Sequence, residues 1–107
     1  MKTKTKYDVN YFINKFETIP DYEWCEGQCT KVLNNNIQHC ALGHCGVTKN
    51  MEGNDLTDES KALIKLFGGN PNKPCYEGGA DAVISVNDGG PGSKQRILNK
   101  LKSLKTN

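Results

Sequence analysis

Two histidine-cysteine pairs lie within eleven residues of this chain, in the stretch IQHCALGHCGV from position 37 to 47. His39, Cys40, His44 and Cys45 include the only 2 histidines of the sequence. Imidazole and thiolate groups are ligands that zinc prefers, and they are also the base and the nucleophile of cysteine enzymes. The stretch could therefore hold a metal, take part in thiol chemistry, or pack tightly in the core.

A zinc site needs four ligands in a tetrahedron, commonly supplied as two closely spaced pairs. Cys25 and Cys29 form one such pair, and Cys40 and His44, at i and i+4 of one helix face, form a second. A Cys-x-x-Cys knuckle is missing, however, and free cysteine is common in protein cores. We expect no metal or other cofactor, with zinc as the alternative.

A cysteine hydrolase needs a thiol, a histidine within hydrogen-bond reach, and a group that orients the histidine. Cys29, His44 and either Asn87 or Asp88 supply these types, and the phrases GQCTKV and GHCGV are similar to phrases in amidase domains that cut bacterial cell walls. Only fourteen residues separate Cys29 from His44, where that fold needs a much longer intervening sheet. We expect no enzyme, with a cysteine-dependent hydrolase as the alternative.

The single tryptophan and the Asn-Asp pair are further candidates for a binding site. Trp24, His39, His44, Asn87 and Asp88 could line a groove that receives a partner. A lone tryptophan is more often a core anchor, and an Asn-Asp pair before a helix more often makes a turn or a cap. Both interpretations stay open for these residues.

The length of 107 residues suits one compact domain, residues 1–107, in which residues 1–6 are expected to form a flexible lysine-threonine tail. No apolar run approaches the roughly 18 residues that a membrane span requires, and no apolar segment follows the N-terminal lysines. The 5 cysteines are an odd number, which argues against a complete disulfide framework. We expect a soluble protein in the cytoplasm of a bacterial cell or an infected host cell, without a membrane partner.

Charge is unevenly distributed although the net charge is only +2. The two termini carry eight basic residues and no acidic ones: Lys2, Lys4, Lys6, Lys94, Arg96, Lys100, Lys102 and Lys105. The segment from 7 to 92 holds six basic and all 12 acidic residues, a net of −6. This charge does not predict nucleic-acid binding, and it leaves open either solvated faces or a basic contact surface for an acidic partner.

Three helices are predicted from apolar periodicity and capping residues. The first runs from about 9 to 18, with Asp8 as N-cap, a Tyr7–Phe12 staple, and Pro20 beyond its end. The second starts after Thr57 or Asp55 and ends before Gly68, and the third starts after a Ser93 cap. Their apolar faces must build most of the core.

The segments between these helices position the histidine-cysteine stretch. A hairpin turning at Asn34-Asn35 places Cys29 opposite Cys40, and a register shifted by one residue places Lys31 opposite His39 instead. The small residues at 40–47 predict a short, buried central helix, and we expect Trp24 to cover these small residues. Residues 69–80 predict an exposed loop, and the β-branched run 83–86 predicts a strand. The fold class is therefore α+β, mainly helical, with three principal helices, one short central helix and a minimal sheet.

Three short motifs resemble a known family when they are taken together. They are Trp24 followed by Gly27, the run Cys40-Ala41-Leu42-Gly43, and Val86-Asn87-Asp88 before the last helix. The chain resembles, over roughly residues 8 to 104, a family of small bacterial and phage proteins that share a domain of unknown function. It departs from the family pattern at His44-Cys45 and in carrying Cys25 and Cys29. The resemblance implies no particular activity.

We therefore expect a small, soluble, non-enzymatic binding or accessory protein of phage or mobile-element type. Its partner would be a protein or a small molecule, and its oligomeric state is left open.

Overall fold

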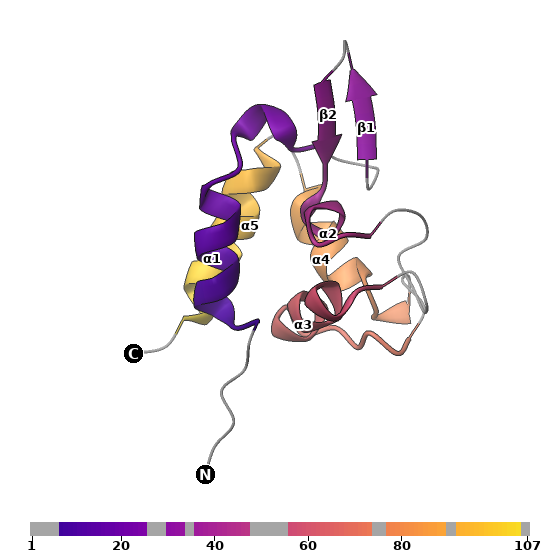
Figure 1. Cartoon of the computed structure of the whole chain (residues 1–107). Helices are drawn as coiled ribbons and strands as arrows, with labels where there is room; N and C mark the ends of the chain where they lie inside the picture. The colour runs from indigo at the N-terminus through magenta and orange to yellow at the C-terminus, as the bar shows by residue number, and fades with distance from the viewer. Residues whose placement is uncertain are drawn as a thin grey trace.

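The computed structural model describes residues 7–25, 30–33, 36–47, 56–73, 77–89 and 92–105. The elements in these ranges are α1 (Val9–Glu17), η1 (Asp21–Glu23), β1 (Thr30–Leu33), β2 (Asn36–His39), α2 (Ala41–His44), α3 (Asp58–Leu66), α4 (Asp81–Asn87) and α5 (Ser93–Leu104). Figure 1 shows α1 and α5 side by side, α2, α3 and α4 grouped beside them, and the hairpin projecting from one end. The predicted α+β class is confirmed.

Helix α1 begins where its capping residues predict. The side chain of Asp8 accepts a hydrogen bond from the backbone N–H of Tyr11 at 2.9 Å, which satisfies one of the free donors of the first turn. The ring of Tyr7 lies with its centroid 6.4 Å from that of Phe12, so the predicted staple is present. The helix ends at Glu17, before Pro20, which cannot continue it.

Helix α3 is also bounded by local signals. The Thr57 hydroxyl accepts from the backbone N–H of Ser60 at 3.0 Å and donates to the carbonyl of Cys45 at 2.6 Å, so the cap also ties α3 to the end of α2. Gly68 has a φ of +92° at the C′ position, as predicted. A Cβ on Gly69 would lie 2.6 Å from the Gly79 carbonyl oxygen, so this close approach requires glycine. The alternative cap, Asp55, lies outside the described residues.

The hairpin has the register centred on Asn34-Asn35. Thr30 pairs with His39 and Val32 pairs with Ile37, so the shifted register with Lys31 opposite His39 is wrong. Cys29 and the two turn residues lie outside the described ranges. The base of the hairpin is joined to the preceding segment, because the Cys25 backbone N–H donates to the His39 carbonyl at 3.0 Å.

The short helix α2 is buried, as its small residues predict. Ala41 and Leu42 are fully buried, and the Cys40 side chain caps the helix by accepting a hydrogen bond from the Gly43 N–H. Figure 1 shows α2 between the hairpin and α4. The predicted central helix is therefore confirmed.

The strand predicted at residues 83–86 is wrong, because these residues belong to helix α4. Ala80, Val83 and Asn87 are all buried at i, i+3 and i+7, which is a helical period. The β-branched residues of this run have a weak preference for strands, and burial against α2 and α5 overrides it. In the described part of the chain, the sheet has only the two strands of the hairpin.

Helix α5 begins at Ser93, one residue earlier than a Ser93 cap requires. The N-cap is Gly92, whose φ of +81° suits glycine, and Ser93 is the first, buried residue of the helix. The apolar face is as predicted, with Ile97, Leu98 and Leu101 in the core. Within the described ranges, no helix is both long and apolar enough to cross a lipid bilayer.

The loop from 69 to 80 is exposed only in part. Asn70, Asn72 and Lys73 are exposed as predicted, but Pro71 and Ala80 are buried. Cys75 lies outside the described residues. The loop therefore contributes Ala80, at its C-terminal end, to the core.

The core lies between the α1–α5 pair and the group α2 to α4. Each of these five helices contributes fully buried side chains to the core: Phe12, Phe16, Leu42, Leu63, Ile64, Val83, Ile97 and Leu101. None of the hairpin side chains that the structure describes belongs to this cluster.

Candidate functional site

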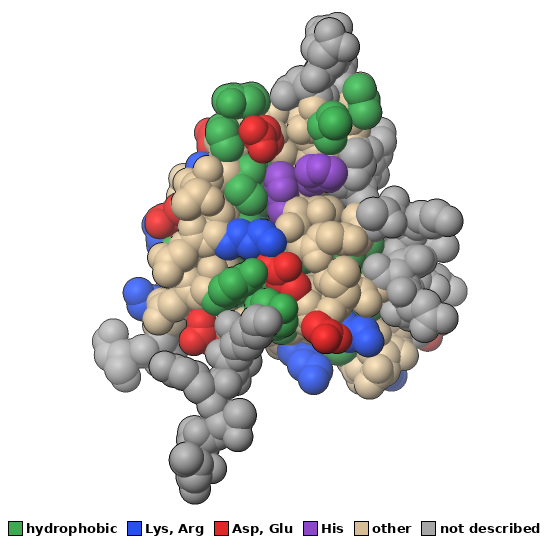
Figure 2. Space-filling view, in the orientation of Figure 1, with side chains coloured by type: hydrophobic (Ala, Val, Ile, Leu, Met, Phe, Trp, Pro, Cys, Tyr) green, Lys and Arg blue, Asp and Glu red, His purple; other side chains and the backbone are tan. Residues whose placement is uncertain are grey.

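The fold brings both histidines and the tryptophan together. The ring centroids of His39 and His44 are 5.2 Å apart, and those of Trp24 and His44 are 4.7 Å apart. A bridge between Trp24 and His39 aligns the two backbone segments. Figure 2 shows the histidines adjacent to one another on one face of the molecule. Three of the five predicted binding residues are thus neighbours, and their role in binding stays a prediction.

The environment of His44 keeps its imidazole neutral. Burial, followed by the charge of His39, lowers the pKa of His44 to about 4, although a backbone hydrogen bond with Glu23 acts in the opposite direction. Its Nε2 atom is buried and has no hydrogen-bond partner among the described residues. At neutral pH His44 is therefore an uncharged aromatic group that packs against Trp24.

The described cysteines are buried in the interior. Cys25, Cys40 and Cys45 form no disulfide with one another and are each at most 5% exposed. Burial raises the pKa of the Cys45 thiol far above its ordinary value, so this side chain stays protonated and is a poor nucleophile. These three thiols behave as small apolar side chains, and one of them also caps α2.

The two chemical alternatives both use Cys29, which lies outside the described residues. The zinc tetrad of Cys25, Cys29, Cys40 and His44 and the Cys29–His44 pair of a hydrolase therefore stay predictions. Within the described ranges, no three side chains of His, Cys, Asp or Glu are grouped closely enough to hold a metal ion.

Asn87 joins three segments of the chain inside the core. Its Oδ1 accepts from the backbone N–H of Ala41 at 3.1 Å, and its Nδ2 donates to the carbonyl of Cys25 at 3.0 Å. The same Nδ2 donates to the exposed carboxylate of Asp88 at 2.8 Å. Asn87 is 1% exposed, so its polar groups are used to hold α4, α2 and the start of the hairpin together.

Trp24 is also a structural anchor in this fold. It is 6% exposed, its ring packs against Phe16 with centroids 5.2 Å apart, and its Nε1 donates to the Ile19 carbonyl. A hollow of about 290 Å³ lies beside it, lined also by Asp21 and by residues 92–95 at the start of α5. This hollow is thus bordered by α5, and the groove predicted between Trp24 and the Asn87-Asp88 pair stays a prediction.

A polar cluster that the sequence did not reveal joins α1 to α3. Lys15 forms an ion pair with Glu59 at 2.5 Å, and the Tyr11 hydroxyl donates to the same carboxylate at 2.8 Å. Burial and the bond to Glu59 raise the pKa of Tyr11 to about 12, so Tyr11 stays a hydrogen-bond donor. The i, i+4 spacing of Tyr11 and Lys15 is the only sequence signal of this cluster, and Glu59 comes from a distant helix.

The hairpin and the adjoining η1 turn present an exposed apolar surface, which we call the hairpin patch. Tyr22, Val32 and Ile37 are 63%, 67% and 55% exposed, and they are the large hydrophobic residues exposed among those described. Val32 and Ile37 form a cross-strand pair, and Gln38 Nε2 donates to the Tyr22 carbonyl at 2.9 Å. The sequence predicted the hairpin but not this surface, because the pattern alone does not show what covers a strand pair.

No family model, curated protein or solved structure matches this chain. The resemblance to small bacterial and phage proteins therefore stays a prediction. We base the functional proposal on the surface of the chain itself.

Proposed function

We propose that this protein is a small, non-enzymatic binding protein that contacts a partner protein through the hairpin patch. The observation that carries this proposal is the exposure of Tyr22, Val32 and Ile37, three large apolar side chains on the hairpin and on the η1 turn that contacts β2. Contiguous exposed apolar surface in a soluble protein marks interaction sites more often than single exposed residues do.

The geometry of the hairpin suits such a contact. Val32 and Ile37 are β-branched and directly opposed, so they present a stiff apolar pair rather than mobile side chains. Backbone hydrogen bonds hold the base of the hairpin against Trp24 and Cys25. A preorganised surface of this kind loses little conformational entropy when a partner covers it.

The interior supports binding rather than catalysis. Buried thiols such as Cys45 are protonated, Asn87 is fully engaged in hydrogen bonds, and His44 packs against an aromatic ring. These groups stabilise the fold, and a reacting molecule would have to displace them. The accessory role in a phage or mobile element is inferred from the family resemblance alone.

Photo-crosslinking tests this proposal. A photoreactive phenylalanine analogue at Ile37 should crosslink to one protein in lysate of the native host, whereas the same analogue at the exposed Asn99 on α5 should not. The Ile37 crosslink should be lost in a Val32→Thr background. Equal crosslinking at both positions, or none at Ile37, would overturn the proposal. A crosslink to a second copy of this chain would also overturn it, because the patch would then join two copies.

A further inference from the structure

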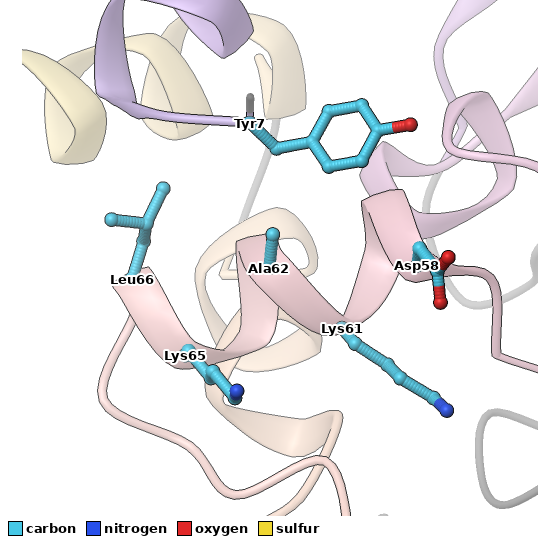
Figure 3. A pocket seen from close by; sticks show the side chains of 6 residues that line it. All are labelled: Tyr7, Asp58, Lys61, Ala62, Lys65 and Leu66. Atoms are coloured by element: carbon cyan, nitrogen blue, oxygen red, sulfur yellow. The ribbon is translucent and has the colours of Figure 1, made fainter. Parts of the chain in front are cut away.

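A second surface lies on the side of α3 that faces Tyr7. One hollow of about 480 Å³ is lined by Tyr7, Asp58, Lys61, Ala62, Lys65 and Leu66 (Figure 3). A second hollow, of about 230 Å³, is lined by Asp8, Val9, Asn10, Leu66, Leu104 and Lys105. The two hollows have Leu66 as a common lining residue, and we call them together the α3 groove.

The α3 groove has an apolar strip and a cationic strip along one helix. Ala62 and Leu66 are spaced by one helical turn, and so are Lys61 and Lys65. Figure 3 shows the Tyr7 ring across from Ala62, so it forms the opposite wall. The ring is held in place by Tyr11, whose ring centroid is 5.1 Å away.

The two lysines of the groove differ from other lysines of the fold. Lys15, Lys94 and Lys102 form ion pairs with carboxylates of α1, α3 or η1. Neither Lys61 nor Lys65 forms an ion pair within the described residues. Their charge is therefore available to a ligand.

The surroundings of the groove add positive charge. Lys105 lines its far end and adds a third basic side chain to Lys61 and Lys65. Two carboxylates, Asp58 and Asp8, also line the groove, so its lining has three basic and two acidic side chains.

We propose that the α3 groove binds an acidic peptide segment of a partner protein. An apolar side chain of the segment would cover Ala62 and Leu66, and flanking carboxylates would pair with Lys61 and Lys65. Two hollows that meet at Leu66 suit an extended segment better than a small anion. The apolar floor and the two carboxylates disfavour a nucleic-acid backbone. Figure 1 shows α3 at the end of the molecule away from the hairpin, so this site is independent of the hairpin patch.

The test uses the full chain and a short fluorescein-labelled peptide in which glutamates flank a central Leu-Phe pair. Fluorescence anisotropy should show binding that Lys65→Glu weakens by about tenfold or more, with a similar effect of Lys61→Glu. Lys31→Glu is the matched control, because it makes the same charge change at an exposed lysine of β1 and should leave the affinity unchanged. Amide resonances of Ala62 and Leu66 should shift on titration, and those of residues 36–39 should not.

Two altered probes separate the proposal from its competitors. Replacing the glutamates by lysines, or the Leu-Phe pair by serines, should abolish binding, because both the charge and the apolar contact are required. A failure of the parent peptide to bind, an equal loss with Lys31→Glu, or tighter binding of a single-stranded oligonucleotide that depends on Lys61 and Lys65 would overturn the proposal.

Discussion

Helix α2 and the hairpin meet at Cys40, yet their side chains are used in opposite ways. Around α2, groups that could do chemistry are turned inward, and Asn87 and Cys40 hydrogen-bond to the backbone of the helix. On the hairpin, groups that usually build a core are turned outward, with Val32 67% exposed and Ile37 55% exposed. The polar groups of Asn87 and Cys40 are thus buried and hydrogen-bonded, whereas Val32 and Ile37 are in contact with water.

This difference indicates that the residues around α2 stabilise the fold, whereas those of the hairpin are available for binding. A buried polar group with all its partners stabilises one arrangement of the chain, because any other arrangement leaves it unsatisfied. An exposed apolar pair contributes little to folding and gains free energy only when another surface covers it. Substitutions near α2 should therefore change stability, and substitutions on the hairpin should change binding.

The largest expected effect is that of Asn87→Ala. This change leaves the buried N–H of Ala41 and the carbonyl of Cys25 without their partner, which should lower the free energy of unfolding by about 3 kcal/mol or more. Urea denaturation measures this loss. Asp88→Ala, at the exposed neighbour, should cost much less, and equal effects of the two changes would show that Asn87 does not join these segments.

Overpacking α2 should have the next largest effect. Ala41 is fully buried, so Ala41→Leu should force the surrounding core apart at a cost of about 1–3 kcal/mol, and Gly43→Leu should do the same. Thermal unfolding compared with the exposed control Ser85→Leu measures the cost. A variant that melts like the parent would place α2 outside the core.

Acid should destabilise the protein in part through His44. Its pKa of about 4 in the folded state lies below the unfolded value of 6.5, so the unfolded chain binds the proton more tightly. The stability from the neutral imidazole is present above about pH 6.5 and is lost as the pH falls toward 4. His44→Gln should flatten the stability profile in this window relative to the parent, and an unchanged profile would contradict the burial of His44.

Metal removal should have no effect on stability. We predict that protein purified without added metal contains well under one equivalent of zinc, and that a chelator leaves its melting temperature unchanged. Elemental analysis and calorimetry check this prediction. Stoichiometric zinc, lost together with the fold in Cys40→Ser, would instead assign the cysteines and His44 to a metal site.

Local signals made much of the fold predictable from the sequence. Asp8, Thr57 and Gly68 mark the ends of their helices, and they act on residues close in sequence. The position of the asparagine turn predicted the hairpin register. Residues 81–87 were mispredicted because packing against distant helices, rather than the β-branched residues, decides their conformation.

The candidate site was predictable only in part, for a similar reason. The contact between His39 and His44 was predictable, because only a few positions separate the two residues in the sequence. The Lys15–Glu59 pair joins residues 44 positions apart, and no local pattern indicates it. The hairpin patch depends on what the rest of the chain leaves uncovered, which becomes visible only once the fold is complete.

Among the substitutions, the smallest expected change in stability is that of the double variant Val32→Thr/Ile37→Thr. Threonine keeps the β-branched shape that suits a strand and removes apolar surface, so the free energy of unfolding should stay within about 0.5 kcal/mol of the parent. The same variant gives the most direct test of the hairpin patch, because its affinity and its stability can be measured side by side.

The deciding measurement is the dissociation constant of the crosslinked partner for this double variant and for the parent, determined by calorimetry together with urea denaturation of both proteins. We predict an affinity about tenfold or more weaker with unfolding essentially unchanged. Unchanged affinity with a loss of more than about 2 kcal/mol of folding free energy would show that the pair stabilises the fold, and would contradict the proposed binding surface.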